Sequence, residues 1–197
     1  MIINKYVLFL LASSLTNISF ASPDDDDDND TLLPCPAQAI INMDKQFGHG
    51  TSLNTTCSQV RTEIKDVFAW NSAGINKKKK LGQQVHVTRN SVNNYEKIYG
   101  MKINKDFEVI AIGYSGGGRW LLTDEAYNRT YDVTTGNPTA ALTVSLIERG
   151  VKVYMCQNTM RGNGWVSSDL LPGVKMVPSG AVSILDFEHL GYKYINP

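Results

Sequence analysis

Three cysteines are the side chains of this sequence best suited to covalent chemistry. Cys35 and Cys57 flank a segment rich in Thr, Ser, Asn and Gly, whereas Cys156 lies far along the chain in an apolar run. A bridge between Cys35 and Cys57 would close a loop of ~20 residues and stabilise the fold by roughly 3 kcal/mol. We therefore predict a disulfide between Cys35 and Cys57, which leaves Cys156 as the odd thiol.

The surroundings of Cys156 favour thiol chemistry. The residue is predicted to end a buried strand and to precede a polar loop that contains Asn158 and Arg161. If the side chain faces that loop, backbone N–H groups and the guanidinium would lower the pKa of the thiol. The alternative is an inert buried thiol that packs as a small hydrophobic group. The residues alone leave both interpretations open.

A second chemistry is indicated around Ser115. Residues 113–117 read GYSGG and fit the G-x-S-x-G pattern of a serine hydrolase, between a predicted strand and helix. Asp169 or Asp186, and then His189, follow in a suitable order. However, His189 falls inside a predicted helix, and triad histidines normally lie on loops. A structural Gly-rich turn or an anion-binding loop is the alternative; no Gly-Lys-Ser/Thr follows, so a phosphate-binding P-loop is disfavoured.

The elements that position these residues alternate along the chain. Apolar periodicity and Gly or Pro boundaries predict strands at 66–70, 107–112, 151–156 and 175–178, and helices at 81–99, 119–122, 138–149 and 181–190. This order predicts an α/β fold with a doubly wound, mainly parallel sheet and helices on both faces. Ligands bind at the carboxyl ends of such strands. Asn71, Ser115 and Cys156 are expected there.

The N-terminal residues are typical of an exported protein. Lys5, the apolar residues 6–12 and the small residues Ser19 and Ala21 form a signal-peptide pattern. The apolar stretch is too short to cross a membrane. We therefore expect a signal peptide at 1–21, an acidic and irregular segment at 22–60, and one α/β domain at 61–197. The protein would be periplasmic or secreted, with no membrane attachment after cleavage.

The charge balance limits the class of partner. The 197 residues include 19 basic and 19 acidic side chains, and six of the acids are Asp residues at positions 24–28 and 30. Without the signal peptide and this run, 18 basic residues face 13 acidic ones, a net charge of +5. The run is expected to stay solvated, and it lacks the spacing of an EF-hand loop. We expect no metal, no cofactor and no nucleic-acid partner.

Several motifs in the C-terminal half occur in a fixed order. They are GVKVYMCQNTM at 150–160, DLLPGV at 169–174, VPSG at 177–180 and GYKYI at 191–195. In these residues the chain resembles the DsrE/DsrF-like family of sulfur-relay proteins, and specifically its exported, single-domain branch. The resemblance extends less tightly back to about Val67. It departs from that branch at Tyr114 and Ser115, where a His-Gly pair is often found.

The resemblance carries functional expectations. It implies a flavodoxin-like domain that assembles as a homo-oligomer, in which Cys156 accepts sulfur as a persulfide and passes it to the thiol of a partner protein. From their places at the strand ends, and not from the resemblance, we expect Asn158 and Arg161 to orient or stabilise the anionic sulfur and Asn71 and Ser115 to line the rim. The resemblance also disfavours the hydrolase. The remaining alternative is a non-catalytic binding or assembly module with a packed Cys156.

Overall fold

The structure is a computed structural model that describes residues 33–34, 56–57 and 63–197. The described residues all belong to one unit of the chain, Leu32–Pro197. In this unit, β1 (Leu33–Pro34) pairs antiparallel with β2 (Thr56–Cys57). The predicted signal peptide, the Asp run and Cys35 lie outside the described residues, so the disulfide between Cys35 and Cys57 stays a prediction.

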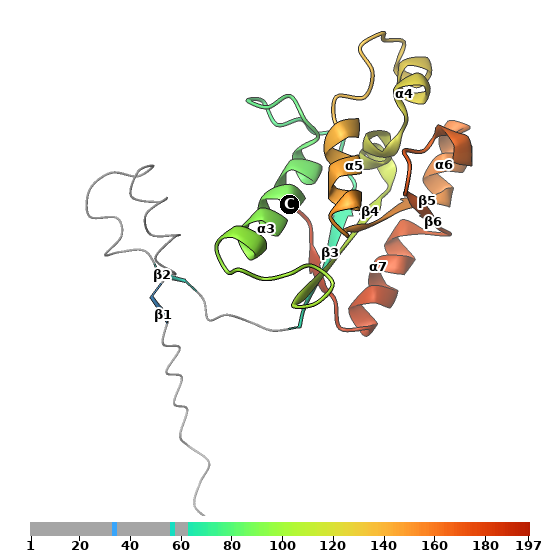
Figure 1. Cartoon of the computed structure of the whole chain (residues 1–197). Coiled ribbons are helices and arrows are strands. Elements are labelled where there is room, and N and C mark those ends of the chain that lie inside the picture. The colour runs from blue at the N-terminus through green and yellow to red at the C-terminus, as the bar shows by residue number, and fades with distance from the viewer. Residues whose placement is uncertain (1–32, 35–55, 58–62) are drawn as a thin grey trace, which may run out of the picture. The chain divides into compact units, whose positions relative to one another are not determined.

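A five-stranded parallel sheet forms the centre of the α/β domain (Figure 1). Its order is β6-β5-β4-β3-β7, so the chain steps outward from β3 to β6 and then returns to the other side of β3. This confirms the predicted parallel α/β sheet and adds β7, which was not predicted. The strands are β3 (Ile64–Trp70), β4 (Phe107–Gly113), β5 (Lys152–Cys156), β6 (Lys175–Val177) and β7 (Lys193–Ile195).

Helices connect the strands and differ from the prediction in three places. Residues 157–163, predicted as a polar loop, form a helix; the Gly-rich turn is part of a 3-10 helix; and the segment 123–137 contains a further helix. The helical elements are α3 (Gln83–Lys97), the 3-10 helix η1 (Ser115–Leu121), α4 (Asp124–Tyr131), α5 (Ala140–Glu148), α6 (Gln157–Asn163), the 3-10 helix η2 (Ser167–Asp169) and α7 (Gly180–His189).

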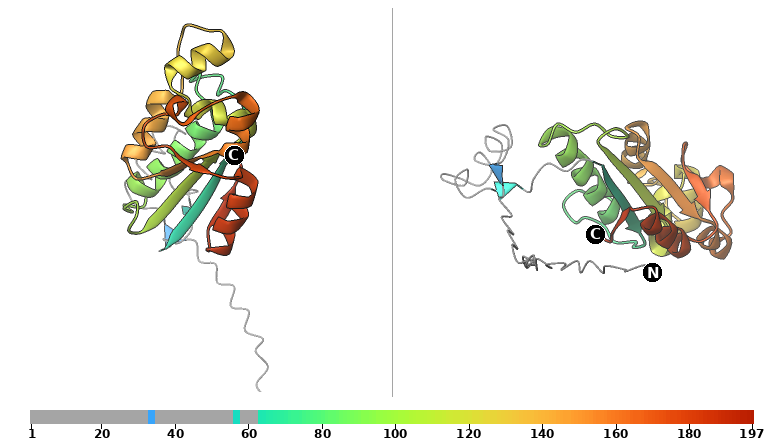
Figure 2. Two further views of the ribbon diagram at one scale, coloured as in Figure 1. Left: turned by 90° about the vertical axis from the view of Figure 1, so that its right-hand side faces the viewer. Right: turned by 90° about the horizontal axis from the view of Figure 1, so that it is seen from below.

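The two faces of the sheet are covered unequally. Alternate strand residues such as Phe68 and Met155 face the larger core, which includes residues of α3, α4, α5 and α6. The intervening residues, such as Val67 and Ile112, form a smaller core with Ile184 of α7. Among the described elements, α7 is the one helix on this face, and Figure 2 shows it on the side of the sheet away from α3.

Two negative findings apply to the part of the chain that the structure describes. None of its helices is long and apolar enough to cross a membrane. It also contains no group of three or more His, Cys, Asp and Glu side chains arranged to hold a metal ion.

Candidate functional site

The carboxyl edge of the sheet collects the residues that the sequence singled out. Asn71 follows β3, Ser115 follows β4, and Cys156 is the last residue of β5. Because the strands are parallel, their carboxyl ends meet at one edge. Gly180, the first residue of α7, reaches the same edge after β6 and donates a backbone hydrogen bond to Cys156.

The Cys156 thiol is buried but surrounded by hydrogen-bond donors. Its residue is 4% exposed. Burial raises the pKa of the thiol and is the largest single effect, but the N–H groups of Thr159, Gly180 and Asn158 and the hydroxyl of Thr159 together lower it below its usual value. Hydrogen bonds to the charged form favour that form. The site therefore stabilises a thiolate.

Two helix starts meet at this sulfur. The first N–H groups of a helix have no partner within the helix and carry partial positive charge. The donors Asn158 and Thr159 belong to the first turn of α6, and Gly180 opens α7. A Cβ on Gly180 would lie 2.9 Å from the Cβ of Tyr114, so only glycine lets the first turn of α7 come this close. One sulfur thus accepts from both helices.

Thr159 is a candidate site residue that the sequence analysis missed. Its Oγ1 accepts a 2.9 Å hydrogen bond from the N–H of Ser115, and its methyl group lies against Gly118. These contacts fix the side chain, and the hydroxyl proton is left to be donated to the Cys156 sulfur. The Cys-x-x-Thr spacing would have identified it only if residues 157–163 had been predicted as a helix.

Asn158 and Arg161 interact with each other rather than with the sulfur through their side chains. Arg161 Nη1 donates a 3.0 Å hydrogen bond to Asn158 Oδ1, and both residues are exposed. Asn158 acts on Cys156 through its backbone N–H. The pKa of Cys156 is therefore lowered by backbone groups and a hydroxyl, not by the guanidinium that the sequence analysis expected.

Asn71 is engaged in a polar network at the rim. Its Oδ1 accepts from Gln84 Nε2 at 2.8 Å, and its Nδ2 donates to the Tyr114 hydroxyl at 3.2 Å. In the register of β4 and β5, Gly113 pairs with Met155. The residues that follow this pair, Tyr114 and Cys156, therefore lie on the same face of the sheet. Asn71 therefore orients Tyr114 beside the site.

The glycines after Ser115 serve close packing. A Cβ on Gly116 would lie 2.9 Å from the backbone nitrogen of Ala73, and one on Gly117 would overlap the Trp70 carbonyl. The 3-10 helix η1 thus packs its backbone directly against the end of β3. This supports the structural interpretation of the Gly-rich turn. Ser115 itself is exposed and has a left-handed backbone, with φ of 50°.

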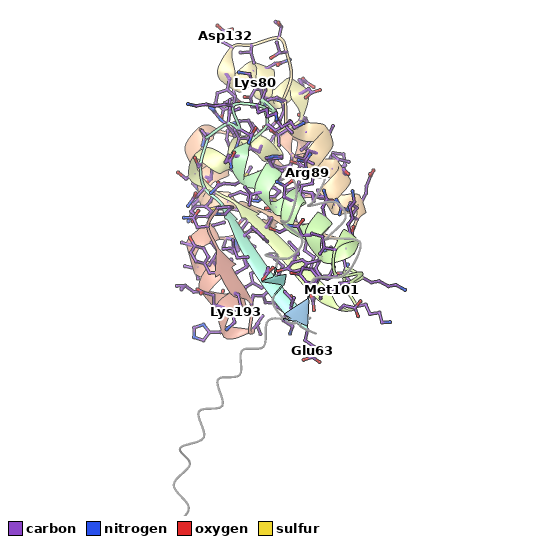
Figure 3. All side chains as sticks on the ribbon, turned by 90° about the vertical axis from the view of Figure 1, so that its left-hand side faces the viewer. Glu63, Lys80, Arg89, Met101, Asp132 and Lys193 are labelled. Atoms are coloured by element: carbon purple, nitrogen blue, oxygen red, sulfur yellow. The ribbon has the colours of Figure 1, made fainter. Side chains whose placement is uncertain are left out.

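The structure contradicts the serine hydrolase. Ser115 lies at the carboxyl edge, whereas His189 ends α7, which leaves that edge and runs ~15 Å toward the amino edge. In Figure 3, Lys193, just after α7, lies at the opposite end of the domain from Lys80, which lies in the loop after β3. His189 Nδ1 is 2.8 Å from the Leu185 carbonyl of its own helix, and Asp169 is paired with Arg129. His189 and Asp169 therefore form no catalytic triad with Ser115.

Comparisons with known proteins agree with this architecture. Residues 86–197 match the DsrE/DsrF-like family. The protein of unknown function MTH1491 from Methanobacterium thermoautotrophicum is 23% identical, with a TM-score of 0.51 over 69% of this chain and 99% of its own. The ychN protein from E. coli is 17% identical, with a TM-score of 0.45 over 68% of this chain and 99% of its own. A search of curated proteins finds no match.

The family match covers more than half of the chain and includes Cys156, α6 and α7. The likeness to MTH1491 supports the flavodoxin-like α/β fold that the parallel sheet already indicates. This chain belongs to the DsrE/DsrF-like family.

Proposed function

We propose that the protein handles sulfane sulfur through Cys156, as a carrier in a sulfur relay. The observation that supports this most directly is the set of donors on the Cys156 sulfur, which come from two helix starts and from Thr159. A thiol with a lowered pKa is ionised at neutral pH to a larger extent and is both the nucleophile and the leaving group that sulfur exchange needs. Membership in the DsrE/DsrF-like family points to the same chemistry.

The proposed reaction has two exchange steps. The Cys156 thiolate attacks the outer sulfur of a donor hydropersulfide; the donor S–S bond breaks, and its electron pair leaves with the donor thiolate. The proton stays on the transferred sulfur, so Cys156 becomes a hydropersulfide. An acceptor thiolate then attacks that outer sulfur and releases Cys156 as a thiolate. The steps move one sulfur atom and consume no oxidant or reductant.

The site suits a singly charged sulfur. The groups that stabilise Cys156 are neutral donors from the backbone and one hydroxyl. These donors would act in the same way on a persulfide anion, since such groups favour negative charge wherever it lies within hydrogen-bonding reach. Ser115 is exposed and contacts Thr159, so the sulfur donor would approach from the carboxyl edge.

We also propose the cellular setting that this chemistry requires. The protein would be exported, lose residues 1–21, and act in the periplasm or outside the cell with a sulfur-donor or acceptor protein. Under oxidising conditions a disulfide between Cys35 and Cys57 would leave Cys156 as the free thiol. N-terminal sequencing of the mature protein and disulfide mapping test this; a bridge that includes Cys156 would remove the proposed site.

The deciding experiment is mass spectrometry of the non-reduced, folded protein after incubation with polysulfide. We expect a mass increase of one sulfur atom on the peptide that contains Cys156, and none in Cys156→Ser. The competing function is a non-catalytic binding module, favoured by the 4% exposure of Cys156. A folded protein whose Cys156 takes up no sulfur would support that function and overturn the proposal.

A further inference from the structure

The excess positive charge of the chain is concentrated in one segment. Between Asp66 and Glu96 the sequence contains no acidic residue and five basic ones, Lys77, Lys78, Lys79, Lys80 and Arg89. Residues 31–197 contain 18 basic and 13 acidic side chains, so outside this segment 18 − 5 = 13 basic residues balance 13 acidic ones. The net charge of +5 therefore belongs entirely to residues 67–95.

The four lysines lie on a tight turn that is anchored to the domain. A β-bridge between Ile75 and Gly82 closes the turn, and the carbonyl of Asn76 accepts a 2.8 Å hydrogen bond from the N–H of Lys80. The N–H of Gly82 donates to Thr139 Oγ1 at 2.8 Å, which ties the turn to the start of α5. All four lysines are exposed. Their ammonium groups thus extend into solvent from a fixed backbone.

Two side chains of α3 extend this positive region. Arg89 Nη2 donates a 2.6 Å hydrogen bond to His86 Nδ1. Burial lowers the pKa of His86, and the charges of Arg89 and Lys79 lower it further, so the imidazole connects the turn to Arg89. None of the three ion pairs recorded between described residues includes these side chains. We call His86, Arg89 and the four lysines at 77–80 the basic surface.

The basic surface lies at the same edge of the sheet as Cys156. The turn follows β3 and α3 begins directly after it, whereas Cys156 ends β5. Figure 3 shows Lys80 at the end of the domain opposite Lys193. Only β4 separates β3 from β5, so the two strand ends are ~10 Å apart. A protein interface of about 800 Å² per partner is roughly 30 Å across, enough to include both regions.

We propose that the basic surface binds an acidic protein, the donor or acceptor of sulfur, by attracting carboxylates that surround the reactive cysteine of that protein. The inference rests on the proposed function and adds the kind of partner and the surface that it contacts. Unpaired charge near a reactive group steers a partner of opposite charge and accelerates its association, an effect that salt weakens.

The geometry favours a protein over a small anion or a membrane. Small anions are held by convergent N–H groups or by a guanidinium that is free to bind with two nitrogens. Here the N–H groups of Lys79 and Lys80 are bonded to Asn76, and Arg89 Nη2 is bonded to His86. An exchange partner must also reach Cys156 from this edge, and a membrane held against the basic surface would obstruct it.

Sulfur transfer from two synthetic peptides tests the proposal. Each peptide carries a cysteine hydropersulfide, flanked in one by Asp residues and in the other by Ser residues. The second-order rate constant for transfer to Cys156 of the mature protein is measured by quenching and mass spectrometry. At an ionic strength of ~0.01 M the acidic peptide should react at least ~10-fold faster, and this preference should disappear near ~1 M, where the Debye length falls to ~3 Å.

The decisive variant replaces the four lysines of the turn, as Lys77→Gln, Lys78→Gln, Lys79→Gln and Lys80→Gln. It should lose the preference at low salt and keep the rate constant for the Ser peptide. The Asp residues also change the reactivity of the peptide itself, so the readout is the ratio of the two rate constants in each protein.

A matched control makes the same change in charge at the other edge of the sheet. Lys102, Lys105, Lys175 and Lys193 are exposed and lie before or at the starts of β4, β6 and β7. Replacing these four by Gln should leave the preference of the wild type unchanged. Circular dichroism verifies that each variant is folded, and every protein keeps the acidic run at 24–30.

The outcomes separate this inference from the function on which it rests. No transfer from either peptide would overturn both. Equal rates from the two peptides, or a preference that persists in the variant of the turn, would overturn the acidic partner alone. So would binding to vesicles of phosphatidylglycerol and phosphatidylcholine that is lost in the same variant, because it would assign the basic surface to a membrane.

Discussion

The contribution of Thr159 to the Cys156 site can be measured with one substitution. Thr159→Val has nearly the same shape but replaces the hydroxyl by a methyl group. It removes the donor to the Cys156 sulfur and the acceptor of the 2.9 Å hydrogen bond from the Ser115 N–H. The methyl group that lies against Gly118 is kept, so the local packing should be preserved.

The expected size follows from the charge on the acceptor. A hydrogen bond to a charged group contributes about 1.5–3 kcal/mol. Since ~1.4 kcal/mol corresponds to a factor of ten in an equilibrium constant, losing the hydroxyl should raise the pKa of Cys156 and lower the ionisation constant of its thiol about tenfold or more. The backbone donors from α6 and α7 remain, so the stabilisation of the thiolate is reduced but not lost.

The assay is the pH dependence of Cys156 alkylation by iodoacetamide in folded protein. The midpoint, the pH at which the alkylation rate is half of its maximum, should be higher in Thr159→Val than in the wild type. In Thr159→Ser, which keeps the hydroxyl, it should be close to the wild-type value. Thermal unfolding of the variants separates this effect from the cost of leaving the Ser115 N–H without a partner, about 1–3 kcal/mol. A folded Thr159→Val with an unchanged midpoint would refute the reasoning, because the hydroxyl would then not act on the sulfur.

Two further predictions concern stability. Gly117→Ala should destabilise the fold by about 3 kcal/mol in urea unfolding, since its Cβ would overlap the Trp70 carbonyl. Gly162→Ala is the control: no atom lies within 4 Å of the added Cβ, and the residue is in helix α6, so this change should not destabilise the fold and should stabilise it by at most about 1 kcal/mol. Asp66→Asn should raise the melting temperature at pH 7. Burial raises the pKa of Asp66 above 3.8, so at neutral pH the ionised carboxylate lowers the stability of the native state, and the neutral amide of Asn removes this cost. This gain should shrink as the pH falls toward 3.8, where Asp66 is increasingly protonated in both states, and a gain independent of pH would contradict the assignment.

The elements that the sequence predicted correctly have strong local signals. β4 is a nearly continuous apolar strand, and α3 has apolar residues at steps of three and four before Gly100. The missed elements lack such signals. α6 is polar except for Met160, which is its buried residue, and β7 has three residues held by pairing with β3. Their structure depends on contacts with the rest of the domain, which local periodicity does not report.

The same distinction applies within the site. Cys156 was identifiable because it ends an apolar run, which predicts the carboxyl end of a strand. Ligands bind at the carboxyl ends of strands in α/β sheets. Gly180 was not identifiable, because its role depends on α7 returning to the end of β5 after β6 is formed. Arg161 was assigned to the sulfur from sequence proximity, but the helical geometry of α6 pairs it with Asn158 instead.

The sequence by itself determined the α/β class, the order of most elements, the family resemblance and the position of the candidate thiol, Cys156. These follow from apolar periodicity, from glycine and proline boundaries and from motif order, all of which are local. The tertiary structure decided which groups act on the thiol, that Ser115 and His189 are separated, and that one face of the sheet carries α7 alone. The physical reason is that donors, charges and apolar surfaces act over a few ångströms in space, and the fold alone sets which residues come that close.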